Sequence, residues 1–355
     1  MKRFTAVTLI IMVVLLAWPA IGVLGGVSTT SAVNKATAYL QTQQQNDGSY
    51  TEFDGPVNAT CGAGLAIAAA GLDVNNWKKS GLSGIDFLLT QKDALSNAAD
   101  ADANSAKIAQ LVMLLVASGK DPHVFGGVDW VAILSGTQNA ATGAYGTAFI
   151  RHPWIMMALH AANETIPANA IDFLVANQES NGGFGVNGLG SGSDTNTTAI
   201  CLEALAAAGA ANDSTVVQKA VAYLHTQQNS DGGFPWAKPS PWGTDSDASS
   251  TSWVIQGLIA AGENHTGPDW TVSGHTPVSF LLGMQNTSGA FGYQTTWSDD
   301  NLMCTYQAIP ALMGKTFPLD YTAPVSGDPN PVTAPGGTST PNPAQDPPYL
   351  PYTGR

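Results

Sequence analysis

The sequence predicts an all-α fold built from six repeats of one helix pair, and three observations support this class. A short helix that ends in Gln and runs into a Gly turn recurs through residues 30–320. A second helix, rich in Ala and other small residues, follows each turn and usually stops at a Gly. The chain is 44% apolar over 355 residues, which is enough to bury a core.

Residues 1–27 have the composition of a secretory signal peptide or a membrane anchor. Lys2 and Arg3 precede an uncharged apolar stretch that reaches Val27, and small residues lie near its end. The stretch is also long enough to span a bilayer, so both alternatives stay open. Either one places the rest of the chain outside the cytoplasm, and we expect an extracellular protein that is secreted or anchored at the cell surface.

Residues 323–355 are predicted to form a disordered, Pro-rich stalk. Nine prolines lie between Pro324 and Pro351, and few large apolar residues are present to bury a core. The end, Leu350-Pro351-Tyr352-Thr353-Gly354, resembles the sortase signal that attaches surface proteins to Gram-positive cell walls. In that class a hydrophobic segment and a basic tail follow the motif, so either the sequence is clipped there or the match is chance.

The chain is acidic and poor in basic residues. Thirteen Lys and Arg stand against 26 Asp and Glu, which gives a net charge of −13 and excludes binding to nucleic-acid phosphates. Three cysteines cannot form a disulfide framework in a chain of this length. We expect a monomer that is attached to membrane or cell wall through its termini. Its expected partners are a small hydrophobic molecule, or a surface protein or glycan.

The turn after each first helix carries Gln, then Gly four residues later, then an aromatic residue two further on. The Gly supplies a positive φ that other residues resist. The Gln stands at a helix end, where carbonyl groups lack partners, so its amide is predicted to bond them and to lie on the aromatic ring. The third copy has one extra residue, and Gln91 begins a degenerate copy. The five full copies are Gln44/Gly48/Tyr50, Gln138/Gly143/Tyr145, Gln178/Gly182/Phe184, Gln228/Gly232/Phe234 and Gln285/Gly289/Phe291.

This Gln-Gly-aromatic clasp resembles the repeat of squalene cyclases. Together with the Ala-rich second helices, it resembles the prenyltransferase and squalene-oxidase repeat superfamily. The resemblance implies that residues 28–322 form a closed (α/α)6 toroid, in which the second helices make an inner ring around a central cavity. An open solenoid of helix pairs has similar periods but lacks this clasp. Members of the superfamily include terpene cyclases, protein prenyltransferases, thioester domains and cobalamin carriers, so the fold alone does not give the function.

Three equivalent acidic residues precede the later second helices. Asp194, Asp247 and Asp299 each stand fifteen residues before the Gly that ends the helix. They are expected either to cap the helix or to form a ring of carboxylates at one mouth of the cavity. The resemblance implies that a terpene cyclase protonates an alkene with Asp-x-Asp-Asp here, whereas Asn196 and Thr197 follow Asp194. An amide or a hydroxyl cannot deliver that proton.

This chain lacks the residues that other chemistries of the superfamily require. The zinc site of protein prenyltransferases needs Asp-x-Cys, which this chain does not contain, so no metal is expected. Thioester domains need Cys-Gly-Glu-Gln, but the chain has Cys61-Gly62-Ala63-Gly64. Cobalamin carriers open their inner helices with runs similar to residues 193–199. No cofactor is certain on this basis, and a corrinoid is one ligand that the resemblance allows.

Polar residues inside a second helix are expected to face the cavity or to pair, because neighbours surround such a helix on three sides. With nearby aromatic groups they suit an apolar ligand that is oriented by a few polar groups. In a closed ring the first and last copies adjoin, and Cys61 and Cys304 each stand ten residues before their Gly, so we predict a disulfide between them. The candidate ligand-binding residues are His152, Trp154, Glu203, Trp253, Gln256, Tyr306 and Gln307.

The function predicted from the sequence is ligand binding without catalysis. An exported cell-surface toroid would bind a small hydrophobic or corrinoid-like ligand, or a protein or glycan, in its cavity or at the rim. The alternative is a divergent terpene cyclase-like isomerase or lyase that lacks the Asp-x-Asp-Asp acid and uses Asp194, Asp247 or Asp299 instead.

Overall fold

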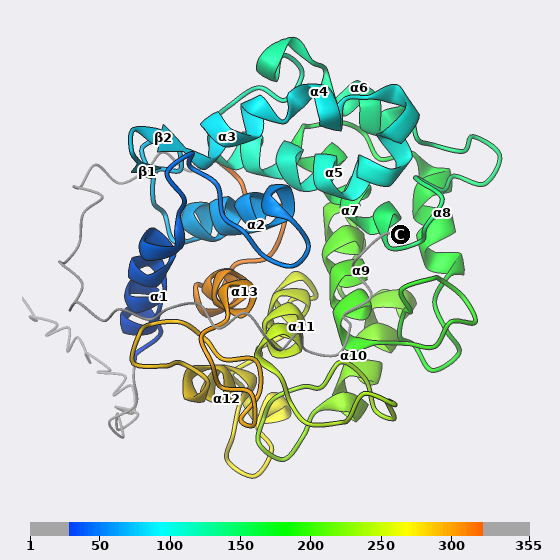
Figure 1. The fold of residues 1–355 in the computed structure, drawn as a ribbon. Helices are drawn as coiled ribbons and strands as arrows, with labels where there is room; N and C mark the ends of the chain where they lie inside the picture. Colours follow the sequence, from blue (N-terminus) through cyan, green and yellow to red (C-terminus); the bar gives the residue numbers. More distant parts are fainter. Residues whose placement is uncertain (1–27, 322–355) are drawn as a thin grey trace, which may run out of the picture.

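The structure is a computed structural model, and it describes residues 28–321. The predicted signal segment and the Pro-rich stalk lie outside this part of the chain. The described residues form a predominantly helical fold, in which the helices follow one another in pairs around a common centre (Figure 1). A short antiparallel hairpin, β1 (Lys78–Lys79) and β2 (Leu82–Ser83), is the only sheet within residues 28–321.

The second helix of each pair lies on the inside of the molecule (Figure 1). Each inner helix packs against the next one along the chain, and the last packs against the first. This arrangement fits the α/α toroid class that the repeats predict. The inner helices are α2 (Pro56–Ala69), α5 (Ala101–Ala117), α7 (Arg151–Ala161), α9 (Thr195–Ala207), α11 (Ala248–Ala260) and α13 (Leu302–Leu312).

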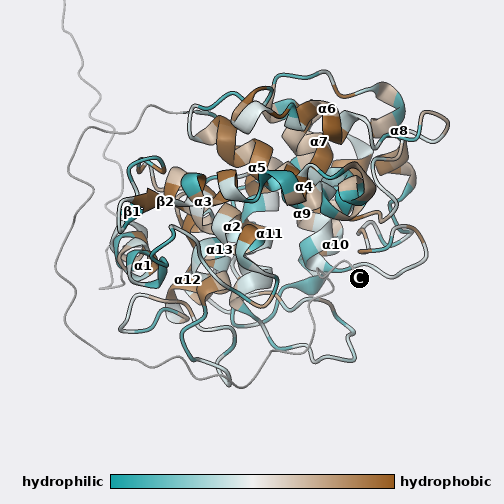
Figure 2. Cartoon of the chain, turned by 45° about the horizontal axis from the view of Figure 1, so that its top comes forward, coloured by the Kyte–Doolittle hydropathy of each residue, from teal (hydrophilic) through white to brown (hydrophobic). Residues whose placement is uncertain are grey.

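The first helices lie on the outside, and hydrophilic residues are mainly in the connecting loops (Figure 2). No helix within the described residues combines the length and the apolar character needed to cross a membrane. The outer helices are α1 (Thr29–Gln43), α3 (Gly84–Thr90), α6 (Trp130–Ser135), α8 (Ala168–Ala176), α10 (Thr215–Gln227) and α12 (Pro277–Gly283). Short helical turns in the loops are α4 (Lys92–Leu95), η1 (Ala98–Asp100), η2 (Phe125–Gly127) and η3 (Pro268–Trp270).

Small residues allow the inner helices to approach closely. Every residue of α9 from Thr195 to Leu205 is buried. A Cβ at Gly257 of α11 would lie 2.7 Å from the Cα of Ala199 in α9, so only Gly fits at this crossing. The Ala, Gly and Ser content of these helices is therefore a packing requirement of the ring.

The Gln of the turn motif joins one helix pair to the next. Gln178 Nε2 donates to the carbonyl of Gly182 at 2.8 Å and to that of Val216, at the start of α10, also at 2.8 Å. The predicted bond to the carbonyls at the end of its own helix is wrong, because the turn directs the amide toward the following unit. The same pair of bonds, one to the turn Gly and one to the next unit, is made by Gln44, Gln228 and Gln285.

The last clasp joins the end of the chain of repeats to its beginning. Gln285 Nε2 donates to the carbonyl of Gly289 at 3.0 Å and to that of Ala32, in the first turn of α1, at 2.8 Å. A Cβ at Gly289 would lie 2.3 Å from the carbonyl oxygen of Lys35. This Gly is needed for its φ of 95° and for the close approach of α1.

The aromatic residue of the turn is tied to the inner helix that follows. The backbone N–H of Phe184 donates to Thr198 Oγ1 at 2.9 Å, and in the third unit the N–H of Tyr145 donates to His152 Nδ1 at 3.0 Å. His152 Nε2 in turn bonds the carbonyl of Ala170 at 3.0 Å, and burial lowers the pKa of His152 to about 4. His152 is thus a neutral structural residue, which corrects its predicted role in ligand binding.

The chain after α13 crosses the end of the ring at which the inner helices finish. This floor segment, residues 313–321, reaches α5 through Tyr321, whose ring would lie 2.8 Å from a Cβ at Gly119. It reaches α11 through Phe317, whose ring centroid is 6.2 Å from that of Trp253. The floor segment therefore lies beneath the space that the inner helices surround.

Glu203 of α9 holds the floor segment in place. Its Oε1 accepts hydrogen bonds from the hydroxyl of Thr316 at 2.9 Å and from the N–H of Phe317 at 3.0 Å. Glu203 is fully buried, and this burial raises its pKa to about 8 although both hydrogen bonds oppose the shift. The side chain thus contacts the floor segment, which corrects its prediction as a ligand-binding residue.

We predict that Gln285→Leu lowers the free energy of unfolding by about 1–3 kcal/mol, because two buried carbonyls lose their shared donor. The measurement is chemical denaturation. Gln138→Leu is the matched control, since Gln138 Nε2 makes one exposed contact, 3.4 Å from Asn169 Oδ1. That control should change stability by less than about 0.5 kcal/mol. Equal effects of the two substitutions would contradict the role of the clasp.

We predict that Glu203→Gln flattens the dependence of stability on pH. Because the folded state raises the pKa of Glu203 to about 8, its contribution to stability is fully present below the ordinary carboxyl range and is lost as pH rises through about 8. The variant should match the native chain near pH 5 and exceed its stability at pH 9 by on the order of a few kcal/mol.

The measurement for Glu203 is the melting temperature at pH 5, 7 and 9 for the native chain and the variant. Asp194 and Asp247 are common to both proteins, so their titration cancels in the difference. Asp299→Asn, at an exposed carboxylate, is the control and should give a difference that does not vary with pH. A constant difference for Glu203→Gln as well would contradict the assignment.

Candidate functional site

A cavity of about 520 Å³ lies inside the ring, and all six inner helices contribute to its wall. Its mouth lies at the N-terminal ends of these helices, where the loops before α2, α7 and α9 supply lining residues. One of these, Phe53, is 46% exposed. Phe317 of the floor segment lines the cavity from the other end. A space of this size accommodates a drug-sized molecule.

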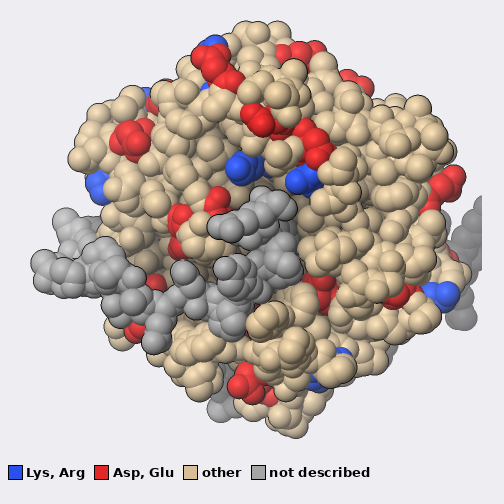
Figure 3. All heavy atoms as spheres, turned by 45° about the vertical axis from the view of Figure 1, so that its right-hand side comes forward, with Lys and Arg blue, Asp and Glu red and all other residues tan. Residues whose placement is uncertain are grey.

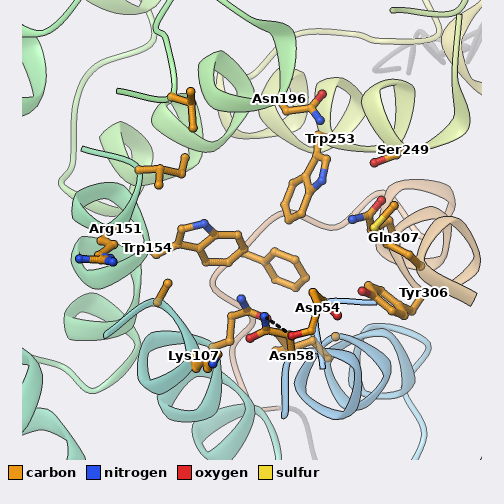
Figure 4. Close-up of a pocket in the computed structure, with 18 of the residues that line it drawn as sticks. Asp54, Asn58, Lys107, Arg151, Trp154, Asn196, Ser249, Trp253, Tyr306 and Gln307 are labelled. Atoms are coloured by element: carbon orange, nitrogen blue, oxygen red, sulfur yellow. Dashed lines mark hydrogen bonds between the residues drawn. The ribbon is translucent and has the colours of Figure 1, made fainter. Parts of the chain in front are cut away.

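Aromatic rings form one part of the wall. Trp154 of α7 and Trp253 of α11 meet edge to face with ring centroids 5.6 Å apart, and Phe317 packs on Trp253 (Figure 4). Tyr306 of α13 lies over Gly62 of α2, where a Cβ would be only 2.7 Å from the Tyr306 ring. These rings offer an apolar surface, and their faces also attract positive charge.

Asp54, in the loop before α2, is the acidic residue in the wall of the cavity. Its Oδ1 is buried without a hydrogen-bond partner among the described residues. Burial raises the pKa of Asp54 to about 6, whereas the side chain of Asn58 and the cation of Lys107 act in the opposite direction. A carboxyl group with this pKa is protonated in mildly acidic solution and can act as a general acid.

Two cations line the cavity on α5 and α7. Arg151 is already engaged, since it pairs with Asp102 and donates to Thr147 Oγ1 at 3.0 Å. Lys107 makes no hydrogen bond or ion pair with any residue that the structure describes, and its charge acts on Asp54. Figure 3 shows two Lys or Arg side chains close together on one face of the molecule.

The three carboxylates predicted at the cavity mouth do not line it. Asp194 caps α9 by accepting from Thr197 N at 2.7 Å and from Thr197 Oγ1 at 2.8 Å. Asp247 caps α11 through Ser250 in the same way. Burial raises the pKa of both carboxyls to about 7. Asp299 is exposed, and the cap of α13 is Asn301 instead. The structure thus favours the capping alternative.

Five of the predicted ligand-binding residues line the cavity: Trp154, Trp253, Gln256, Tyr306 and Gln307. The predicted Cys61–Cys304 disulfide is absent, because both cysteines are free and buried. Cys304 lies near the backbone of Ser249 at the start of α11.

The described residues do not supply the side chains that a metal ion or a corrinoid would need. Among residues 28–321, no group of three or more His, Cys, Asp or Glu side chains could hold a metal ion. A corrinoid is larger than a drug-sized ligand, and the cavity wall includes no His that could coordinate cobalt. The residues present therefore do not fit a corrinoid enclosed in the cavity.

Other lining residues were not among the sequence candidates: Asp54, Asn58, Asn196, Ser249 and Phe317. Asn196 and Ser249 could have been found, because each stands two residues after a capping Asp, on the side of the helix that faces the centre. Asp54 and Phe317 lie in irregular segments, where no periodic pattern indicates which way a side chain points.

Part of the chain resembles squalene–hopene cyclases in sequence. Residues 156–306 match the squalene-hopene cyclase C-terminal domain family. The squalene–hopene cyclase of Zymomonas mobilis subsp. mobilis is 38% identical over 104 residues, which are 26% of this chain and 15% of that enzyme. The match thus spans a small part of the length of this relative.

Solved structures with a similar fold cover most of the chain. The type II terpene cyclase MstE from Scytonema has a TM-score of 0.56 at 15% identity and covers 80% of this chain and 97% of its own. A variant of MstE in complex with geranylgeranyl dihydroxybenzoate has a TM-score of 0.57 at 14% identity, covering 80% and 96%. A glycosidase has a TM-score of 0.55 at 12% identity, covering 80% and 95%.

At these identities the solved structures indicate a shared fold, and the family match adds sequence support over residues 156–306. Together they support the prenyltransferase and squalene-oxidase toroid superfamily for the helical repeats of this chain.

Proposed function

We propose that this protein is a terpene cyclase-like enzyme that binds an isoprenoid-derived molecule in the central cavity, with Asp54 as its acid. The observation that carries the proposal is the Asp54 carboxyl, which has an unpartnered buried oxygen in the wall of an aromatic cavity and a pKa raised to about 6. The terpene cyclase-like fold favours this reading over the non-catalytic binder that the sequence predicts first.

The position of the acid differs from the pattern that the sequence led us to test. Asn196 and Thr197 occupy the places where Asp-x-Asp-Asp would supply acids after Asp194, and Asp194 itself is a helix cap. Asp54 reaches the same cavity from the loop before α2, on the other side of α13. In this proposal the acid comes from a different loop at the mouth of the cavity, the one before α2.

The reaction we propose is an isomerisation that begins and ends with Asp54. The protonated carboxyl gives its proton to a double bond or an epoxide oxygen of the substrate. The positive charge that develops on carbon faces the rings of Trp154 and Trp253, which stabilise it. Loss of a proton from the carbon skeleton then forms a new double bond and returns the proton to Asp54.

Ligand binding without catalysis is the second candidate, and the polarity of the cavity wall favours it. Asn196 and Ser249 place neutral groups where related chemistry needs acids. With either function, we propose that the protein is an exported, surface-attached monomer, as expected from the sequence. The segments on which this expectation rests, residues 1–27 and 323–355, lie outside the described part of the chain.

We predict that Asp54→Asn lowers the turnover number by about 10²-fold or more while substrate binding is retained, because the amide cannot donate the proton. The assay incubates the purified chain with squalene, oxidosqualene, geranylgeraniol and geranylgeranyl dihydroxybenzoate, and identifies products by gas or liquid chromatography with mass spectrometry. The rate of the native protein should fall as pH rises through about 6, since the acid form of Asp54 is lost there.

The matched control for Asp54 is Asp299→Asn, at an exposed carboxylate outside the cavity. Its activity should equal that of the native protein. Binding of these molecules without turnover, unchanged in Asp54→Asn, would replace the enzyme by the non-catalytic binder.

A further inference from the structure

Besides Asp54 Oδ1, Asn58 Oδ1 and Trp154 Nε1, four buried polar atoms without partners among the described residues belong to side chains that line the cavity on three neighbouring inner helices. They are Asn196 Nδ2 on α9, Ser249 Oγ and Gln256 Oε1 on α11, and Gln307 Oε1 on α13. The first three residues are at most 1% exposed, and all four line the cavity. The helices that carry them, α9, α11 and α13, pack side by side in that order, and we name these four residues the amide wall.

The amide wall is costly to the folded protein unless something bonds to it. An unpartnered buried polar group costs about 1–3 kcal/mol. The other amide atom is already occupied in two of these side chains: Asn196 Oδ1 accepts from Thr195 Oγ1 at 3.2 Å, and Gln256 Nε2 donates to the carbonyl of Ser252 at 3.2 Å. The unpartnered atoms can therefore form hydrogen bonds with water or with a ligand in the cavity.

The chemistry of the wall selects a neutral group that both donates and accepts hydrogen bonds. Amide and hydroxyl side chains offer both functions without charge. The cations of the cavity, Lys107 and Arg151, lie across from Asn196, Ser249 and Gln307 (Figure 4). An anion would therefore bind on the other side, whereas a hydroxyl group matches the amide wall.

We infer that the substrate is a hydroxylated isoprenoid, with its hydroxyl on the amide wall and its hydrocarbon body on Trp154, Trp253 and Phe317. This inference rests on the proposed function, and it names the class of molecule that the same cavity takes. A pure hydrocarbon leaves all four polar residues unpartnered, so the cavity discriminates against it. Sites built to bond a substrate hydroxyl reject the analogue that lacks it more strongly than apolar pockets reject an extra methylene.

The test compares three C20 ligands that share one carbon skeleton: geranylgeraniol, the hydrocarbon without its hydroxyl, and geranylgeranoic acid. Each is supplied from cyclodextrin, and dissociation constants are measured by native mass spectrometry and from the change in intrinsic Trp fluorescence, to which Trp154 and Trp253 in the cavity wall contribute. We expect the alcohol to bind about tenfold or more tightly than the hydrocarbon and also more tightly than the acid.

Two substitutions in the wall and one across from it assign the preference. Gln307→Leu, and Gln256→Met at the more buried position, should each reduce the advantage of the alcohol over the hydrocarbon by about threefold or more, because one polar group of the wall is removed. Lys107→Met removes the cation across the cavity and reports whether an anionic group binds there. Asp299→Asn, at an exposed carboxylate outside the cavity, is the matched control and should not alter the binding of the alcohol. Circular dichroism and melting temperature establish that each variant is folded.

Three results would overturn the inference: equal binding of alcohol and hydrocarbon, no binding of any of the three ligands, or tightest binding of the acid with its loss in Lys107→Met. The last would place an anionic group on Lys107. The binding assay does not depend on turnover. Preference for the alcohol without any product would refute the proposed enzyme and keep the inference, whereas turnover of the hydrocarbon at the same rate would do the reverse.

Discussion

The hydrogen bonds of the turn glutamines hold this structure together. In each of four Gln side chains the amide nitrogen donates hydrogen bonds to two carbonyls, one in its own turn and one in the following repeat. Because Gln285 reaches back to Ala32, the same bond that sets the spacing between neighbours also joins the last pair to the first. Buried carbonyls satisfied in this way need no strand or cap, and loss of the donor would leave them unpaired.

The clasp also explains why the rest of the turn has the residues it has. The Gly must lack a Cβ because the backbone of the next unit lies against it, as Lys35 lies against Gly289. The aromatic residue after it fixes its backbone N–H on the adjacent inner helix through a Thr hydroxyl or, in the third unit, through His152. One short motif thus positions the outer helix, the next unit and the inner helix, and it leaves the inner helices around a central space.

That central space sets what polar residues can do. An inner helix is enclosed by neighbours, so a polar side chain caps a helix end, holds another segment or faces the cavity. Asp194 takes the first course, Glu203 the second and Gln256 the third. Glu203 lies two turns after Asn196 on α9, where the floor segment covers it. Its carboxylate therefore bonds Phe317 of that segment and does not face the cavity. The acid of the proposed reaction then comes from the loop before α2.

The sequence by itself determined the helix pairs, their order and the division between inner and outer helices, because these follow from local spacing: Gln to Gly to aromatic residue, and Ala-rich runs that end in Gly. It also placed Trp154, Trp253, Gln256, Tyr306 and Gln307 near the centre, since helical periodicity indicates which face is inside. Only the tertiary structure decided the rest. The partners of Gln285, the burial of Asp54 and the contact between Glu203 and the floor segment join residues that are far apart in the chain or lie in irregular loops. No local pattern encodes such contacts, because the packing of the whole ring fixes them.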